Sequence, residues 1–260
     1  MLPIRDDNPT RRAPVVTIAL MALCIGVFIL VQPRGGGSEA EQIREAEFTF
    51  QTAAIPCEIV KGRPLAEEEV IDTLATGDDT ACTSDPGTPP AFPGKAVFLA
   101  ILYSMFLHGG WLHLGGNMLF LWVFGNNIED TRGRFRYLLF YLLAGLAATA
   151  AHIAIQPAST VPVVGASGAI AGIMGAYLVL FPNVRIRTLV IFFFITSIQI
   201  RAKWLLGFWL VSQFFVNPND GVAWMAHVGG FLFGVAAALL WKARGEQAEP
   251  VDPEPYGSPA

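Results

Sequence analysis

Charged residues are scarce in this sequence, and their scarcity narrows the class of protein. Of the 260 residues, 15% are Asp, Glu, Lys or Arg, and 53% are hydrophobic. In a soluble domain about a quarter of the residues are normally charged, so this composition argues against one. The formal net charge of −4 is unevenly distributed and indicates no nucleic-acid partner. Several apolar runs approach the ~18–20 residues that cross a bilayer, which predicts an integral, multi-pass membrane protein.

Cysteine is also rare, with three residues in the whole chain and no C-x-x-C pair. This pattern gives no sign of a metal site, and the sequence as a whole implies no metal or cofactor. Cys24 lies within the first apolar run, whereas Cys57 and Cys82 share the polar segment that follows it. If that segment lies outside the cytoplasm, a disulfide between them is feasible, because such compartments are oxidising. Two unrelated free thiols are the alternative.

The apolar runs predict an all-α polytopic fold with six transmembrane helices. A further apolar stretch, 188–200, is followed by Arg201 and Lys203, and one helix running through these charges would be too long for a ~30 Å core. We expect this stretch to lie along the inner membrane interface. The sequence shows no internal repeat of the kind that a transporter would favour. The six expected spans are 14–32, 112–128, 137–156, 167–181, 204–216 and 222–241.

Arginine and lysine residues set the expected orientation, because the cytoplasmic flanks of membrane helices are enriched in them. They cluster before the first span and after the second, fourth and last spans, which places both termini in the cytoplasm. We expect residues 1–13 to form a cytoplasmic N-terminus, 14–241 the membrane domain and 242–260 a disordered cytoplasmic tail. The segment 33–95 contains 12 acidic and 5 basic residues, as suits a long outer loop. The plasma (inner) membrane is the expected location.

A few polar residues converge near the outer ends of the second, fourth and sixth spans. His113 and Asn117 are four residues apart and share one face of a helix. Ser167 opens the fourth span, and His227 lies near the start of the sixth. The expected topology therefore puts these four side chains at a similar depth. Each has a structural alternative, such as helix packing or N-capping for Ser167 and interhelical hydrogen bonding for His113 and Asn117.

Together these residues favour hydrolytic chemistry. A serine hydroxyl is a weak nucleophile at neutral pH and needs a neighbouring base, and the neutral imidazole of His227 suits this role. The amide of Asn117, with His113 beside it and the backbone N–H of Ser167 at a helix start, can stabilise an oxyanion. Apart from Asp220 in the preceding loop, the sequence places no acidic residue near His227. The pattern thus predicts a Ser–His dyad.

Small residues spaced four apart predict where two helices approach closely. Gly168 and Gly172 form one such face, and Gly230 and Gly234 form another on the last span. Faces of this kind let helix backbones come together in lipid. His227 lies three residues before Gly230, so packing of the two faces would bring it to the serine-bearing helix.

Three motifs carry a family resemblance: "HGGWLHLGGN", "GASGAIAG" and "AHVGGFLFG". In this order and on these spans they resemble the rhomboid intramembrane serine proteases, over roughly residues 95–241. The resemblance implies a rhomboid-like six-helix bundle in which Ser167 is the nucleophile and His227 its general base. It also implies that Asn117 and His113 help to form the oxyanion site.

The resemblance extends to residues whose role is structural or uncertain. His108 matches an earlier histidine before the second span, and Glu129 matches a polar cluster at the inner end of that span. The sequence departs from the family at Ala171, where an aromatic residue often stacks on the catalytic histidine. Met174 and Tyr177 are then the candidates for positioning that histidine.

The implied function is that of an intramembrane serine endopeptidase, whose partners are single-span or polytopic membrane-protein substrates. A formed helix hides its peptide bonds, so a substrate segment should unwind locally near its outer boundary. A catalytically silent relative that binds membrane proteins is the alternative. The presence of both Ser167 and His227 argues against it.

Overall fold

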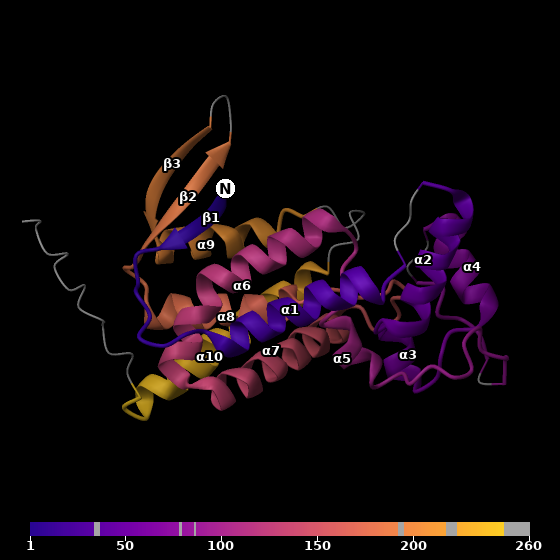
Figure 1. Ribbon diagram of the computed structural model, residues 1–260. Coiled ribbons are helices and arrows are strands. Elements are labelled where there is room, and N and C mark those ends of the chain that lie inside the picture. The colour runs from indigo at the N-terminus through magenta and orange to yellow at the C-terminus, as the bar shows by residue number, and fades with distance from the viewer. Residues whose placement is uncertain (34–36, 78–79, 86, 192–194, 217–222, 247–260) are drawn as a thin grey trace, which may run out of the picture.

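The computed structural model describes residues 1–33, 37–77, 80–85, 87–191, 195–216 and 223–246. Its main body is a helix bundle, with a group of short helices at one end and a small sheet near the other end (Figure 1). The bundle helices are α1 (Val15–Leu30), α6 (Trp111–Arg132), α7 (Arg134–Ile155), α8 (Ser167–Leu180), α9 (Ala202–Gln213) and α10 (Trp224–Ala243).

These bundle helices lie where the sequence predicts its spans, and the chain is predominantly helical. By length and hydropathy, two of the described helices, α7 and α10, are suited to cross a membrane, while α1 and α8 are shorter apolar helices. The count of six spans therefore stays a prediction. With 14 residues, α8 is about 21 Å long, which is less than a ~30 Å hydrocarbon core. If α8 crosses the membrane as predicted, one or both of its ends must lie below the membrane surface.

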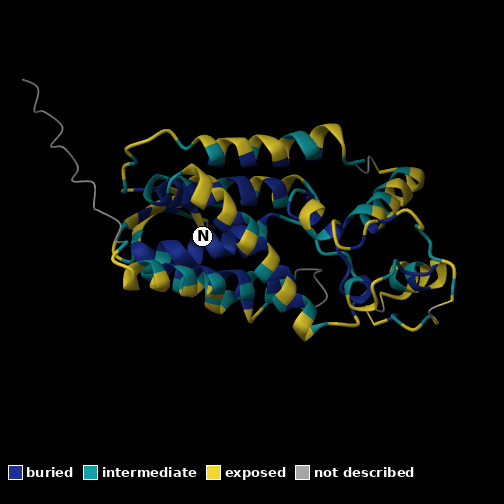
Figure 2. Cartoon of the chain, turned by 90° about the horizontal axis from the view of Figure 1, so that it is seen from below, coloured by how far each residue is buried: buried dark blue, intermediate teal, exposed yellow. Residues whose placement is uncertain are grey.

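Helix α8 forms the centre of the bundle. Its sequence is apolar around the whole circumference, as is typical of a helix that is buried on all sides. Eleven of its 14 residues are buried. Figure 2 shows the same pattern at larger scale, with buried residues in the interior of the bundle and exposed residues along its outer faces. The nucleophile candidate Ser167 is thus carried by the most enclosed helix.

Glycines bring α8 and α10 into backbone contact. A Cβ atom added at Gly230 would collide with the carbonyl oxygen of Gly168, and one at Gly234 would lie 2.7 Å from the carbonyl carbon of Gly172. Neither position has room for a side chain. The close approach places the first turn of α10, which carries His227, beside the first turn of α8.

A three-stranded antiparallel sheet corrects the prediction of an all-α fold. Strand β1 (Leu2–Asp6) pairs with β2 (Arg185–Ile191), and β2 pairs with β3 (Ile195–Arg201). The apolar stretch 188–200 therefore belongs mostly to a hairpin. A short apolar run does not reveal by periodicity alone whether it is strand or helix. Its β-branched residues favour the pleated conformation, and the partner strand β1 lies far away in the sequence.

Asp6 ties the sheet to the bundle. Its carboxylate oxygen Oδ2 accepts hydrogen bonds from Asn127 Nδ2 on α6 (2.7 Å) and from the hydroxyl of Tyr177 on α8 (2.6 Å). Burial raises the pKa of the Asp6 carboxyl to about 6. The expected cytoplasmic N-terminus, residues 1–13, is thereby attached to the helix that carries Ser167.

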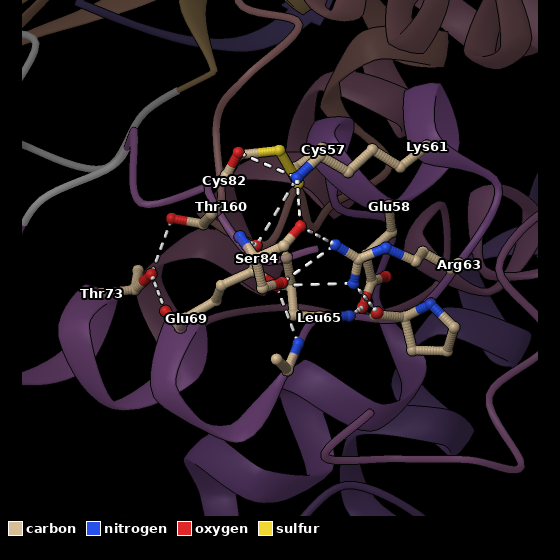
Figure 3. Close-up of polar contacts among 12 residues, drawn as sticks. Cys57, Glu58, Lys61, Arg63, Leu65, Glu69, Thr73, Cys82, Ser84 and Thr160 are labelled. Carbon is tan, nitrogen blue, oxygen red and sulfur yellow. Dashed lines mark hydrogen bonds and ion pairs between the residues drawn. A yellow bond between two sulfur atoms is a disulfide. The ribbon is translucent and has the colours of Figure 1, made fainter. Parts of the chain in front are cut away.

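The segment predicted to be a long outer loop is folded and has its own small core. It contains α2 (Glu39–Thr52), α3 (Pro56–Lys61) and α4 (Glu67–Thr76), and the short helix α5 (Ala100–Ser104) follows it. Cys57 and Cys82 form a disulfide within this segment (Figure 3). Cys24, in α1, is free and buried. Buried Phe50, Ile55 and Leu65 pack around Cys57. We refer to residues 37–95, as far as they are described, as the outer segment.

The buried charged groups of the outer segment, Glu58, Glu69 and Lys95, have charged or hydrogen-bonding partners. Lys95 Nζ lies 2.5 Å from Glu58 Oε2, and both side chains are buried. Burial raises the pKa of the Glu58 carboxyl and lowers the pKa of the Lys95 ammonium group. Glu69 accepts hydrogen bonds from the backbone N–H groups of Ala66 and Ser84 (Figure 3). Removing one partner from such a buried pair leaves an uncompensated charge, so these contacts fix the conformation of the segment.

The C-terminal helix continues past the expected end of the membrane domain. α10 ends at Ala243, and Glu246 forms an ion pair with Arg132 at the end of α6. Residues 242–246, predicted to belong to a disordered tail, are therefore held against the bundle. The rest of the predicted tail, 247–260, lies outside the described residues.

Candidate active site

Ser167 and His227 are in hydrogen-bond contact. Ser167 is the first residue of α8, and His227 lies in the first turn of α10. The distance between Ser167 Oγ and His227 Nε2 is 2.8 Å. The contact follows from the glycine packing described above, because two helices that touch through their backbones bring short side chains at the same level together. A hydroxyl in this position can give its proton to the imidazole.

Gln213 makes the second contact of the histidine. Its side-chain oxygen Oε1 lies 2.7 Å from His227 Nδ1, at the C-terminal end of α9. Its amide nitrogen Nε2 donates to the carbonyl oxygen of Trp209 (3.1 Å). The amide nitrogen is thus turned toward its own helix, and the oxygen faces the imidazole. An acceptor at Nδ1 favours the tautomer with hydrogen on Nδ1 and a lone pair on Nε2, which is the form that can accept the proton of Ser167.

The position of Tyr177 corrects one sequence expectation. Tyr177, a candidate for positioning the histidine, donates its hydroxyl to Asp6 at the other end of α8. Met174, the second candidate, lines the cavity, but the polar contact to His227 comes from Gln213 and a ring contact from Trp209, with 5.9 Å between ring centroids. No sequence signal singled out Gln213, because it lies 14 residues from the histidine on another helix. Asp220 lies outside the described residues.

Asn117 and His113 line the same cavity as the serine and the histidine. The cavity has a volume of about 620 Å³. Asn117 is buried, and within the described chain its Nδ2 group has no hydrogen-bond partner. An unpaired buried donor is costly unless a ligand uses it, and Asn117 is one of the residues that line the cavity. His113 Nδ1 accepts a hydrogen bond from the backbone of Gly109 at 3.3 Å.

Gly165 sets the spacing between His113 and the serine. Its φ angle of +122° lies in a region that side chains rarely adopt. A Cβ atom there would lie 2.8 Å from His113 Nε2 and 3.4 Å from Ser167 Oγ. The N–H of Gly165 donates to the carbonyl oxygen of Ser104 (2.8 Å). This hydrogen bond helps to hold the backbone at Gly165 in its uncommon conformation.

The outer segment holds the loop that leads to Ser167. The N–H of Val163 donates to the carbonyl oxygen of Ala54 (2.8 Å), and the N–H of Cys57 donates to the carbonyl oxygen of Ser159 (2.9 Å). Val163 and Ser159 both line the cavity that contains Ser167 and His227. Two backbone hydrogen bonds therefore join one wall of the cavity to the outer segment, which contains the Cys57–Cys82 disulfide.

His108 and Glu129 have surroundings that differ from those of Ser167 and His227. His108 is buried, and its ring lies edge-on to that of His113 with centroids 5.3 Å apart. Its backbone is held on both sides by the Gln32 side chain. Glu129 accepts hydrogen bonds from the N–H groups of Val16 (2.9 Å) and Thr17 (2.8 Å), which belong to the first turn of α1. This carboxylate satisfies free donors at a helix start and joins α1 to α6.

The arrangement defines a class of protein: a helical membrane-type bundle in which a serine and a histidine from two different helices meet in an internal cavity. The chain belongs to the rhomboid family, whose Rhomboid domain matches residues 95–244. Rhomboid proteins are integral membrane proteins, and the family acts on membrane-protein substrates within the bilayer. The resemblance seen in the three motifs is thus confirmed.

Several relatives are similar over part of their length. Rhomboid-like protein 11, chloroplastic, of Arabidopsis thaliana is 40% identical over 82 residues, which are 32% of this chain and 28% of that protein. Rhomboid protease GluP of Bacillus subtilis is 36% identical over 141 residues (53% and 25%), and Rhomboid protein 1, mitochondrial, of Saccharomyces cerevisiae is 30% identical over 148 residues (55% and 35%). The match spans about a third or less of each of these relatives. Their names include a chloroplast and a mitochondrion, so they do not support the plasma membrane over other membranes.

Proposed function

We propose that this protein is an intramembrane serine endopeptidase that cleaves membrane-protein substrates with a Ser167–His227 dyad. The observation that carries the proposal is the 2.8 Å contact between Ser167 Oγ and His227 Nε2. The unpaired Nδ2 donor of Asn117 on the same cavity adds a group that can stabilise an oxyanion. Both termini are proposed to be cytoplasmic, with the disulfide-closed outer segment on the opposite side of the membrane, where a disulfide persists.

The first half of the proposed reaction uses each of these groups. Ser167 Oγ attacks the carbonyl carbon of the scissile peptide, and its proton moves to His227 Nε2. The carbonyl oxygen becomes negatively charged, and Asn117 Nδ2 donates a hydrogen bond to it. Collapse of this intermediate expels the amine, which takes the proton from His227, and an ester to Ser167 is left. The Nδ1–H group of the charged imidazole stays bonded to Gln213 throughout.

Water completes the cycle in the second half. It attacks the ester, gives its proton to His227 Nε2 and releases the carboxylic acid product, while the histidine proton returns to Ser167 Oγ. The cavity has a mixed polar and apolar lining and room for both water and an extended peptide. Because a helical segment uses its own peptide groups in hydrogen bonds, the substrate must unwind before it enters.

Covalent labelling of the serine tests the proposal. A fluorophosphonate probe reacts with a serine whose hydroxyl is activated by a neighbouring base. We expect the folded wild-type protein to be labelled and S167A to remain unlabelled. The matched control is S197A, which removes an exposed hydroxyl on β3 and should be labelled like the wild type. Absence of labelling in folded wild-type protein would instead support the catalytically silent alternative.

Gln213 is expected to act as a positioning residue for His227. In Q213L the Nδ1–H group loses its acceptor in a buried site, which costs about 1–3 kcal/mol. We expect kcat for a tagged single-span substrate to fall about 10- to 100-fold with little change in KM, because the substrate does not contact this side chain.

The pH profile separates positioning from a general effect on folding. In Q213E the carboxylate keeps an acceptor at Nδ1 and stabilises the imidazolium form. The acid limb of the kcat profile should therefore move to higher pH, while the melting temperature stays near that of the wild type. A loss of kcat in Q213L with an unchanged acid limb in Q213E would show that Gln213 is merely structural.

A further inference from the structure

Four arginines occupy one face of the three-stranded sheet. In the strand register, Arg5 lies directly opposite Arg187, and Arg185 lies directly opposite Arg201. Arg185 and Arg187 are two residues apart on β2, so their side chains point to the same face. All four arginines are exposed. The intervening residue Ile186 is buried against the bundle. We refer to Arg5, Arg185, Arg187 and Arg201 as the arginine face.

The charges of the arginine face are not balanced by the surrounding protein. Like charges directly opposite each other on neighbouring strands are destabilising. In the part of the chain that the structure describes, no carboxylate lies within 4.0 Å of any of these four guanidinium groups. Asp7, the acidic residue next to the sheet, accepts a hydrogen bond from Gln199 instead. An external anion bound to these arginines would reduce the repulsion between them.

The position of the sheet suits an anion at the membrane surface. Strand β2 begins five residues after α8 ends, and Arg201 is the N-cap residue of α9. The sheet therefore lies level with helix ends, and in Figure 1 the β2–β3 hairpin crosses the direction of the helices and reaches to the side of the bundle. Leu2 and Trp204 are exposed nearby, at 41% and 67%. Tryptophan is enriched at membrane interfaces.

We infer that the arginine face binds the phosphate groups of anionic phospholipids in the leaflet on the side of the chain termini. Guanidinium groups bind phosphate through paired hydrogen bonds, and clustered basic residues beside membrane helices bind anionic headgroups. The inference rests on the proposed orientation but not on catalysis. A lipid bound here would also stabilise the sheet. Asp6 of this sheet accepts a hydrogen bond from Tyr177 on α8, the helix that carries Ser167.

Lipid titration of the delipidated, detergent-solubilised full chain tests this inference. Binding is read by native mass spectrometry and by the shift in melting temperature, with phosphatidylglycerol, phosphatidylcholine and inorganic phosphate as separate additions. We expect phosphatidylglycerol to bind and to raise the melting temperature, phosphatidylcholine to do so at least tenfold more weakly, and added salt to weaken the binding. Millimolar inorganic phosphate that reproduced the full shift would overturn the assignment to a lipid headgroup.

Two double variants distinguish lipid binding by the arginine face from a general effect of positive charge on binding. R5Q/R187Q should lower the affinity for phosphatidylglycerol on the order of tenfold or more, and without lipid it should melt at or above the wild-type temperature, because it relieves repulsion. R12Q/R134Q removes the same charge from exposed positions off the sheet and should bind within about twofold of the wild type. Equal phosphatidylglycerol affinity in both variants would refute the inference. Since S167A should bind lipid normally, failure here is distinct from failure of the protease proposal.

Discussion

S167A is expected to lower the rate of substrate cleavage by at least about 10³-fold. Loss of the nucleophile or of its base costs a serine protease several orders of magnitude in kcat, since the two side chains act as a unit. H227A should show a loss of similar size, because Ser167 Oγ has its hydrogen bond to His227 Nε2. The double variant should be little worse than either single one. The measurement is the initial rate of cleavage of a tagged single-span substrate in proteoliposomes.

The control for this experiment is again S197A, which should cleave at the wild-type rate. Melting temperatures of all variants show that a lost rate is not a lost fold, since neither side chain is needed for the glycine contacts of α8 and α10. Equal cleavage by the wild type, S167A and H227A would remove the protease proposal. If the fluorophosphonate labelled Ser167 but no substrate were cleaved, the serine would be activated, but its substrate would not be a membrane-spanning peptide.

G234L is expected to prevent stable folding of the membrane domain. A Cβ at this position would lie 2.7 Å from the carbonyl carbon of Gly172 and 2.9 Å from its Cα. Both atoms belong to the backbone of the central helix, so neither can turn away as a flexible side chain would. Overpacking in a core ordinarily costs about 1–3 kcal/mol, and separating two helix backbones should exceed this range. We expect a large loss of folded protein in detergent, measured by size-exclusion chromatography and thermal unfolding.

Gly207 on α9 provides the matched control, because a Cβ added there meets nothing within 4 Å. G207A should keep or raise the melting temperature, since alanine favours a helix over glycine by about 0.8–1.0 kcal/mol. The milder G234A should fall between the two. If G234L folded with the wild-type melting temperature, α8 and α10 could not be in backbone contact, and the route by which His227 reaches Ser167 would have to be different.

The parts of the fold that follow from local pattern were predictable from the sequence. Apolar run length gives the bundle helices, and four-residue spacing of small residues gives the facing positions on α8 and α10. The expected direction of each span, together with the packing of these two faces, predicts that Ser167 and His227 meet. The sheet was missed because β1 pairs residue 2 with residue 189, and no local pattern reports a contact across such a distance.

Gln213 was missed for a different physical reason. A glutamine near the end of an apolar helix has no diagnostic spacing to a histidine on another helix, and the candidates that the sequence offered were Asp220, Met174 and Tyr177. The identity of the second contact depends on the angle at which α9 meets α10, which sequence pattern does not give. The sequence likewise could not decide whether Cys57 and Cys82 form a disulfide, because their proximity depends on how the outer segment folds.

The hydrogen bonds that join Ala54 and Cys57 to the loop before Ser167 have a consequence for biogenesis. Newly inserted chains whose outer segment is still reduced would have helices in place but one cavity wall unsupported. Cleavage activity would then appear only after translocation and thiol oxidation, later than helix insertion. On the proposed function, this order of maturation would restrain the protease from attacking neighbouring membrane proteins while it is still being assembled.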